Sequence, residues 1–266
     1  MAKIRIIADD LGLNERVNEG ILIALKSGWI SGASLMPAGD AFFDAVKLIK
    51  ESPQFDIGVH VVLVEETPLS KKEDITTLVG KNGFLHKDHR VFFIRYVLGL
   101  VDINDIEKES RLQIKRCLDS GVTPKFINSH QHLHLLPKVL DVFIKLAKEY
   151  DIPYIRIVNE PFGASGGIVR RVQSLVLRSF SHFAYSKIDR NGLKRNDLFV
   201  GFLNAGGITS GDINFAKELS YTRPTKIIEV GCHPGFENDE LRERYKDWGN
   251  YGWERELKVL EESSDK

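Results

Sequence analysis

The sequence predicts an α/β protein with a single-domain, barrel-like (β/α) fold of about seven parallel strands. Apolar runs that are too continuous for half-exposed strands alternate about seven times with helical patterns, as in parallel sheets covered by helices. The length of 266 residues suits one domain of α/β-barrel size. No internal repeat, low-complexity tract or linker divides the chain, so residues 1–266 are expected to form a single domain. An open, doubly wound sheet is the alternative.

Each expected strand is an apolar run bounded by turn residues. The strands are expected at 4–8, 31–36, 55–60, a short run from 126, 154–158, 197–203 and 226–230. The expected helices have apolar residues at helical spacing. They cover about 15–26, 40–52, 87–100, 104–120, 138–150, 168–185 and 215–219.

Two stretches depart from this alternation. Residues 63–90 are rich in Lys, Glu, Thr and Gly and contain an Asn-Gly turn signal. We expect them to form an inserted excursion over the mouth of the fold, with His86 and His89 on the surface. The charged and aromatic residues after Phe236 are expected to form a C-terminal helical tail on the outside of the domain.

The composition narrows the classes of function. Lys plus Arg and Asp plus Glu both number 37, and a net charge of zero argues against nucleic acid or an anionic membrane as a partner. No apolar run approaches the roughly 20 residues of a transmembrane segment, and the first apolar stretch is too short for a signal peptide. Only two cysteines occur, far apart, which favours a reducing compartment, so we expect a cytoplasmic location. The glycine-rich fingerprints of dinucleotide and phosphate sites are absent.

Acidic and imidazole side chains follow three of the expected strands. Asp9 and Asp10 come directly after the first strand, His60 ends the third, and His233 follows the last. An Asp pair is commonly a solvated turn or a helix cap, and a buried histidine is commonly satisfied by a backbone partner. The carboxyl ends of parallel strands nevertheless converge on one face, where ligand sites collect. We therefore expect these residues at a functional site.

Three further histidines lie where the fourth strand gives way to a helix, for which Pro137 is a suitable first-turn residue. If strand geometry continues, His130, His132 and His134 point the same way, whereas in a helix His130 and His134 share a face. Neutral imidazole is the commonest protein metal ligand, so either arrangement favours a metal site.

These residues are suited to metal-assisted hydrolysis. Two histidines and one carboxylate, with open positions, can bind a divalent metal ion that activates water. A second carboxylate can accept the proton of that water, and a histidine from another strand can protonate a leaving amine. Arg156, which apolar residues flank, either pairs with a carboxylate or reaches into the site to steady negative charge.

Four motifs together resemble the YdjC family of carbohydrate deacetylases, in order and spacing over nearly the whole chain. They are Ile6-Ile-Ala-Asp9-Asp10-Leu-Gly12, Ile57-Gly58-Val-His60, Asn128-Ser-His130-Gln-His132-Leu-His134 and His233-Pro-Gly235. The resemblance implies a barrel-like fold that is often dimeric, which makes a homodimer possible. It also implies removal of acetyl groups from N-acetylated sugars with one divalent metal ion, Mg or Zn.

By the same resemblance, Asp10, His60 and His130 match the metal-binding positions, Asp9 the general base and His233 the general acid. Adjacent side chains on an extended segment point in opposite directions, so one of the two carboxylates should hold the ion and the other should face the water or a supporting arginine.

Other positions are less closely defined by the family pattern. His132 and His134 match recurrent family histidines, which implies contact with substrate or support of the metal ligands. Asn128 stands where members often have Asp, which removes one charge beside the site. Residues 156–161 also resemble members associated with hopanoid glycolipid synthesis, so a glycolipid is an alternative to an oligosaccharide as the substrate.

Two other classes of function remain open on these residues. One is a non-catalytic carbohydrate- or metal-binding protein on the same scaffold. The other is a metal-dependent barrel phosphoesterase or sugar isomerase, although the neutral charge and the absence of a dense Lys/Arg cluster near the motifs disfavour phosphate ligands.

Overall fold

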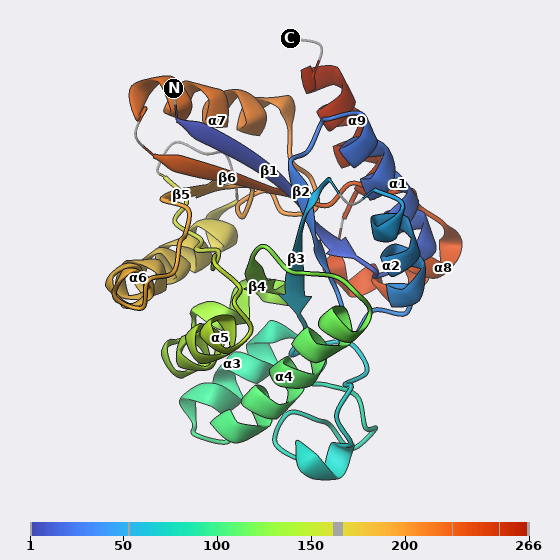
Figure 1. Ribbon diagram of the computed structural model, residues 1–266, viewed down its shortest axis with the longest axis vertical. Helices are drawn as coiled ribbons and strands as arrows, with labels where there is room; N and C mark the ends of the chain where they lie inside the picture. Colours follow the sequence, from blue (N-terminus) through green and yellow to red (C-terminus); the bar gives the residue numbers. More distant parts are fainter. Residues whose placement is uncertain (1, 53, 162–166, 225, 250, 265–266) are drawn as a thin grey trace.

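The computed structural model describes residues 2–52, 54–161, 167–224, 226–249 and 251–264, and its centre is a curled sheet that forms a half-barrel (Figure 1). All paired strands are parallel, in the order β4-β3-β2-β1-β6-β5. The strands are β1 (Lys3–Leu11), β2 (Gly32–Leu35), β3 (Asp56–Val61), β4 (Ile127–Ser129), β5 (Leu198–Val200) and β6 (Ile227–Cys232). The predicted single-domain α/β class with a parallel, barrel-like sheet is confirmed.

Helices surround the sheet on its outside, with α1 and α2 on one side and α5 and α6 on the other (Figure 1). The α-helices are α1 (Glu15–Lys26), α2 (Phe42–Lys50), α3 (His89–Val97), α4 (Ile103–Asp119), α5 (Pro137–Glu149), α6 (Ile168–Arg190), α7 (Ser210–Thr222), α8 (Asp239–Arg244) and α9 (Trp253–Ser264). Short 3₁₀ segments are η1 (Lys72–Asp74), η2 (His130–Leu135) and η3 (Lys246–Trp248). In the described part of the chain, no helix combines the length and the apolar character that crossing a bilayer requires.

Local sequence signals account for several element boundaries. The Asn14 side chain caps α1 by accepting a hydrogen bond from the Arg16 N–H, and α1 buries one apolar face against the sheet. Helix α7 is longer than the expected 215–219, because Thr209 and Asp212 form a reciprocal capping box that starts it earlier.

The expected strand at 154–158 is wrong as a regular strand, which leaves six strands instead of seven in the described residues. The segment makes only isolated bridges with its neighbours on both sides. The Asn196 side chain accepts from the N–H of Ile157 and donates to its carbonyl, both at 2.8 Å, and Ser181 Oγ accepts from the N–H of Val158. Side chains thus replace the backbone partners of a ladder.

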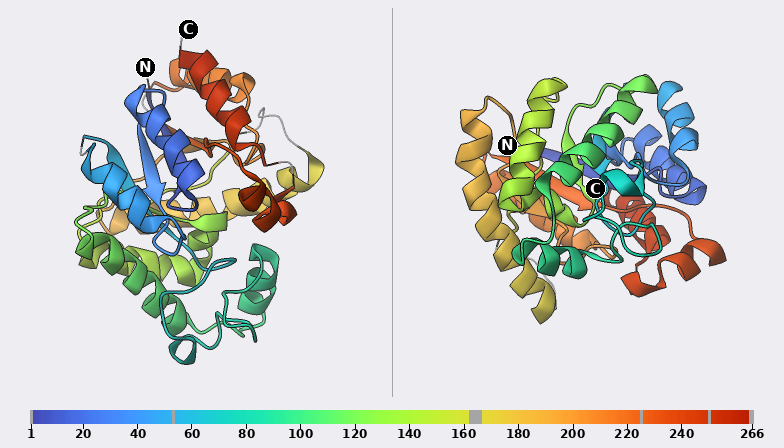
Figure 2. Two further views of the ribbon diagram at one scale, coloured as in Figure 1. Left: turned by 90° about the vertical axis from the view of Figure 1, so that its right-hand side faces the viewer. Right: turned by 90° about the horizontal axis from the view of Figure 1, so that it is seen from below.

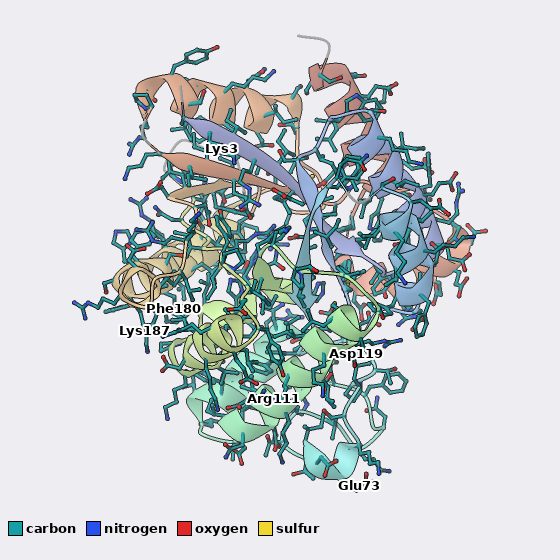
Figure 3. The ribbon with its side chains drawn as sticks, viewed as in Figure 1. Lys3, Glu73, Arg111, Asp119, Phe180 and Lys187 are labelled. Carbon is teal, nitrogen blue, oxygen red and sulfur yellow. The ribbon has the colours of Figure 1, made fainter. Side chains whose placement is uncertain are left out.

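The excursion after β3 contains η1 and irregular turns, and it ends where α3 begins. It approaches the C-terminal segment around α8 and η3, which comes from the other end of the chain (Figure 2). Exposed Glu73 lies on η1 at the outer tip of the excursion (Figure 3). The inner part of the excursion instead faces the carboxyl ends of the strands.

Candidate active site

A cleft of about 1220 Å³ opens where the carboxyl ends of the strands converge. Asp9, His60, His130 and His233 all line it, so the parallel topology brings together side chains that are up to 224 residues apart, between positions 9 and 233. The excursion, the start of α6 and the C-terminal segment form the remaining walls, including Glu65, Glu66, His86, His89, Arg170, Arg244, Trp248 and Tyr251.

Strand β1 is irregular at Asp9 and Asp10. Its register with β2 shifts between Ala8 and Leu11, so that β1 holds one extra residue there, and Asp10 has a φ of 66°. The two side chains therefore do not point in opposite directions, which corrects the expectation from strand geometry. Both approach the His60 ring, with Asp9 Oδ1 3.9 Å from Nδ1 and Asp10 Oδ1 3.3 Å from Nε2.

Asp10, His60 and His130 form a compact group of buried metal-competent side chains. One ligand atom from each lies within 4.8 Å of the others. Asp10 Oδ1 lies 3.3 Å from both His60 Nε2 and His130 Nδ1, whereas its Oδ2 is buried without a hydrogen-bond partner. An orphaned carboxylate oxygen beside two imidazoles fits a divalent cation, because a cation would supply the missing partner.

Neighbouring side chains determine which nitrogen of His60 carries the proton. Asn128 donates from Nδ2 to Asp9 Oδ1 at 3.3 Å, because an ionised carboxylate can only accept. The Asn128 Oδ1 atom then faces His60 Nδ1 at 2.7 Å and accepts its proton. Because Nδ1 is fixed as a donor, Nε2, which faces Asp10, is the nitrogen that would give up its proton and ligate a bound metal ion.

The charges of this group stabilise each other. Burial alone would raise the pKa of Asp10, but hydrogen bonds from His130 and His60 hold it well below its usual range. Burial alone would lower the pKa of His130, but Asp10 and Glu65 raise it well above its ordinary value. The carboxylates of Asp10 and Glu65 therefore favour positive charge between them. A bound cation would supply that charge in place of the protons on the imidazoles.

Asp9 is surrounded by donors. Its Oδ1 accepts from Ser34 Oγ at 2.5 Å and from Asn128, and its Oδ2 accepts from Arg156 Nη1 at 2.5 Å. Burial alone would raise the pKa of Asp9, but Arg156, His60 and His233 together hold it below its ordinary value and keep the carboxylate ionised. Fully buried Arg156 also pairs with Glu229 on β6, so it lies behind Asp9 and is not among the residues that line the cleft.

His233 follows β6, the strand paired with the Asp9 end of β1, and has a carboxylate behind it. Glu256 on α9 accepts a hydrogen bond from the His233 N–H at 2.5 Å, and its Oε2 is 3.7 Å from Nδ1. Burial alone would lower the pKa of His233, but Glu256 raises it above the ordinary value of 6.5. The ring also packs against Tyr251, with centroids 5.1 Å apart. A histidine in this setting favours the protonated form.

The three histidines after β4 are separated by a kink that neither a strand nor a helix predicts. Gln131 and His132 both have a φ of 56°, so the chain turns sharply after His130. His132 lines the cleft with Nδ1 buried and without a partner. His134 faces the interior, where Ser129 Oγ and the Arg156 carbonyl each lie 2.9 Å from a ring nitrogen.

Several residues of the site carried no clear signal in the sequence. Ser34, Glu65 and Trp248 contact the acidic and histidine side chains, yet each belongs to a segment that reads as ordinary strand, loop or tail. His86 and His89, expected on the surface, are half-buried in the cleft wall because the excursion folds back over the strand ends.

The fold and the site define a parallel α/β half-barrel protein with a candidate divalent-metal centre at its strand ends. Comparison with known proteins identifies the family: the chain belongs to the YdjC-like protein family, whose sequence profile matches residues 3–264.

Curated relatives align over nearly the whole chain. A protein of Brevibacillus brevis is 34% identical over 97% of this chain and 90% of its own length, and one of Oceanobacillus iheyensis is 28% identical over 97% and 94%. Both are named carbohydrate deacetylase. A crystal structure of a candidate cellobiose-phosphate cleavage protein from Enterococcus faecalis superposes with a TM-score of 0.76 at 23% identity, covering 99% of this chain and 93% of that one, which supports the fold.

Proposed function

We propose that this protein is a metal-dependent hydrolase that removes the acetyl group from an N-acetylated sugar. The observation that carries the proposal is the convergence, in one cleft, of a metal-competent group, an ionised carboxylate and a histidine backed by a carboxylate. The relatives named carbohydrate deacetylase support the choice of a sugar acetamide as the substrate.

Asp10, His60 and His130 would hold the metal ion. When bound there, the ion supplies a Lewis acid for the acetamide oxygen and lowers the pKa of a water molecule. Two imidazoles with one carboxylate are typical of zinc, whereas magnesium prefers oxygen ligands, so zinc is the better match of the two.

Asp9 acts as the general base. A carboxylate has about four acceptor positions, and Ser34, Asn128 and Arg156 occupy three of them. The remaining position, on Oδ2, can accept the proton of the attacking water. Arg156 positions this carboxylate from behind, which is the first of the two roles considered for it.

His233 acts as the general acid. Its protonated ring, stabilised by Glu256, lines the cleft at the end of β6 and donates a proton to the departing amine. The products are then acetate and a free amino sugar, and every atom of the added water is accounted for.

The cleft wall supplies surfaces for a sugar ring. Trp248 and Tyr251 line it with aromatic faces, and the His132 ring, which also lines it, is placed to meet a sugar hydroxyl. His134 supports the site from behind and does not face the substrate.

The test is acetate release from a panel of N-acetylated monosaccharides, oligosaccharides and glycolipids, measured with the zinc-loaded, magnesium-loaded and chelator-treated protein. We expect release with at least one class of substrate and its loss after chelation. Sugar binding without acetate release across the panel would instead establish a non-catalytic binding protein.

A further inference from the structure

Glu65 is the first polar residue of the excursion, and it is held in an unusual conformation. Its φ is 75°, in the left-handed region that a side chain disfavours at a cost of about 1–3 kcal/mol. The backbone is fixed there by a 2.8 Å hydrogen bond from the Glu65 N–H to the His86 carbonyl. This conformation directs a carboxylate into the cleft, with only 12% of the side chain exposed.

The Glu65 carboxylate contacts one member of the metal-competent group. Its Oε2 lies 3.2 Å from His130 Nε2, while the other nitrogen of the same ring, Nδ1, lies 3.3 Å from Asp10. Glu65 itself is not part of the group whose ligand atoms lie within 4.8 Å of one another. One imidazole is therefore shared between a carboxylate inside the group and a carboxylate outside it.

Trp248 fixes the outer carboxylate. Its indole Nε1 donates to Glu65 Oε2 at 2.9 Å, and its ring packs over His130 with centroids 5.3 Å apart and an interplanar angle of 33°. The excursion and the C-terminal segment, which are 183 residues apart at these positions, thus hold the same imidazole together.

We infer that Glu65, held by Trp248, is a positioning residue for the metal centre. The carboxylate accepts a hydrogen bond from the Nε2–H of His130, so that Nδ1, which is directed towards Asp10, is the nitrogen that would ligate the ion. Ligating histidines usually donate their other N–H to such a partner, and loss of that partner typically weakens metal binding about 10- to 100-fold. The inference rests on the metal role in the proposed function.

The experiment compares zinc dissociation constants of the chelator-treated full-length chain and its variants, measured by competition with a chromophoric chelator. Glu65→Ala should weaken zinc binding about 10- to 100-fold, and Trp248→Phe, which keeps the ring but removes the donor, should weaken it less. Glu65→Gln, whose amide oxygen still accepts from Nε2, should recover part of the loss. Glu73→Gln, at the exposed tip of the excursion, should stay near wild type.

A second readout reports the tautomer directly. In protein labelled with ¹⁵N-histidine, the wild type should show a protonated Nε2 on the zinc-bound His130 ring, and Glu65→Ala should lose this single tautomer. Circular dichroism and thermal melting of each variant separate these effects from loss of folding.

Each outcome bears on one of the two proposals. Unchanged zinc affinity in both Glu65→Ala and Trp248→Phe would overturn the positioning role. Loss of zinc in Glu65→Ala as complete as in His130→Ala would make Glu65 a ligand and would overturn it too. Zinc binding that depends on Glu65 as expected, in a protein that releases no acetate, would refute the deacetylase proposal while the positioning role stands.

Discussion

Asp9 and Asp10 are neighbours in the chain, yet their carboxylate oxygens differ in how many hydrogen-bond partners they have. On the Asp9 side, both carboxylate oxygens accept from buried donors, and Arg156 links this carboxylate to Glu229. On the Asp10 side, one oxygen meets two imidazoles and the other has no partner.

The difference separates two kinds of work that a carboxylate can do. A carboxylate with one acceptor position left and a fixed counter-charge can receive one proton in a defined direction. A carboxylate that meets two imidazoles with one oxygen and leaves the other oxygen orphaned has a vacant acceptor position, which a metal ion would fill. The bulge in β1 allows consecutive residues to take both roles on one face of the sheet.

The largest expected effect comes from Asp9→Asn. An amide cannot accept the proton of water, so turnover should fall about 100- to 10,000-fold while zinc affinity is kept. Acetate release and metal titration on the same preparation provide the measurement.

Folding needs its own control for this variant, because Asp9→Asn leaves Arg156 with Glu229 alone. Breaking a buried pair can cost about 3–5 kcal/mol, so the thermal midpoint should drop as well. Loss of zinc in Asp9→Asn, together with its retention in Asp10→Asn, would mean that the roles of the two carboxylates are exchanged.

The next largest effects test the proposed metal ligands. Asp10→Asn should weaken zinc binding, and excess zinc should partly restore acetate release because the base and the acid are intact.

His60→Ala should lose the metal while the protein stays folded, as elemental analysis and circular dichroism will show. Full metal occupancy in His60→Ala would remove His60 from the centre.

The convergence of this site was predictable because it follows from topology. Asp9, His60, His130 and His233 follow apolar runs, and parallel strands place their carboxyl ends together. One predicted strand, 154–158, was wrong because side chains took the partners of its backbone, and no local pattern encodes such partners.

The local geometry of the site could not be predicted in the same way. Positive φ values occur at Asp10, Glu65, Gln131 and His132. This conformation costs about 1–3 kcal/mol at each residue and persists only where surrounding contacts hold the backbone in it. The contacts that hold them come from distant segments, such as Trp248, so they exist only in the folded chain.

The pH dependence tests the proposed general acid, His233. Because Glu256 raises the pKa of His233, the protonated acid persists above the ordinary value of 6.5 and is lost as the pH rises through the raised pKa. Acetate release should therefore fall on the basic side, and Glu256→Gln should move that fall to lower pH. His233→Ala should flatten the basic limb. An unchanged profile would assign the acid to another group near His233, such as Tyr251, whose ring packs against it.

The smallest expected effects are those of substitutions at His132 and His134. These two histidines show the same contrast, because a ring nitrogen of His132 lacks a hydrogen-bond partner and both ring nitrogens of His134 have one. His134→Phe keeps a ring but removes the partners of Ser129 Oγ and the Arg156 carbonyl. It should lower the free energy of unfolding by about 1–3 kcal/mol, as measured by urea denaturation, with the KM for the sugar unchanged.

His132→Phe should instead leave the free energy of unfolding almost unchanged and raise the KM for the sugar. Its Nδ1 has no partner in the protein, so removing it leaves no other group unsatisfied and should change stability little. If the His132 ring binds a sugar hydroxyl, loss of that hydrogen bond removes about 0.5–1.5 kcal/mol of binding, which raises the KM about 2- to 10-fold. A KM that rises in His134→Phe and not in His132→Phe would place the substrate on the other side of the kink, and the contrast between open and satisfied side chains would then fail as a guide to this cleft.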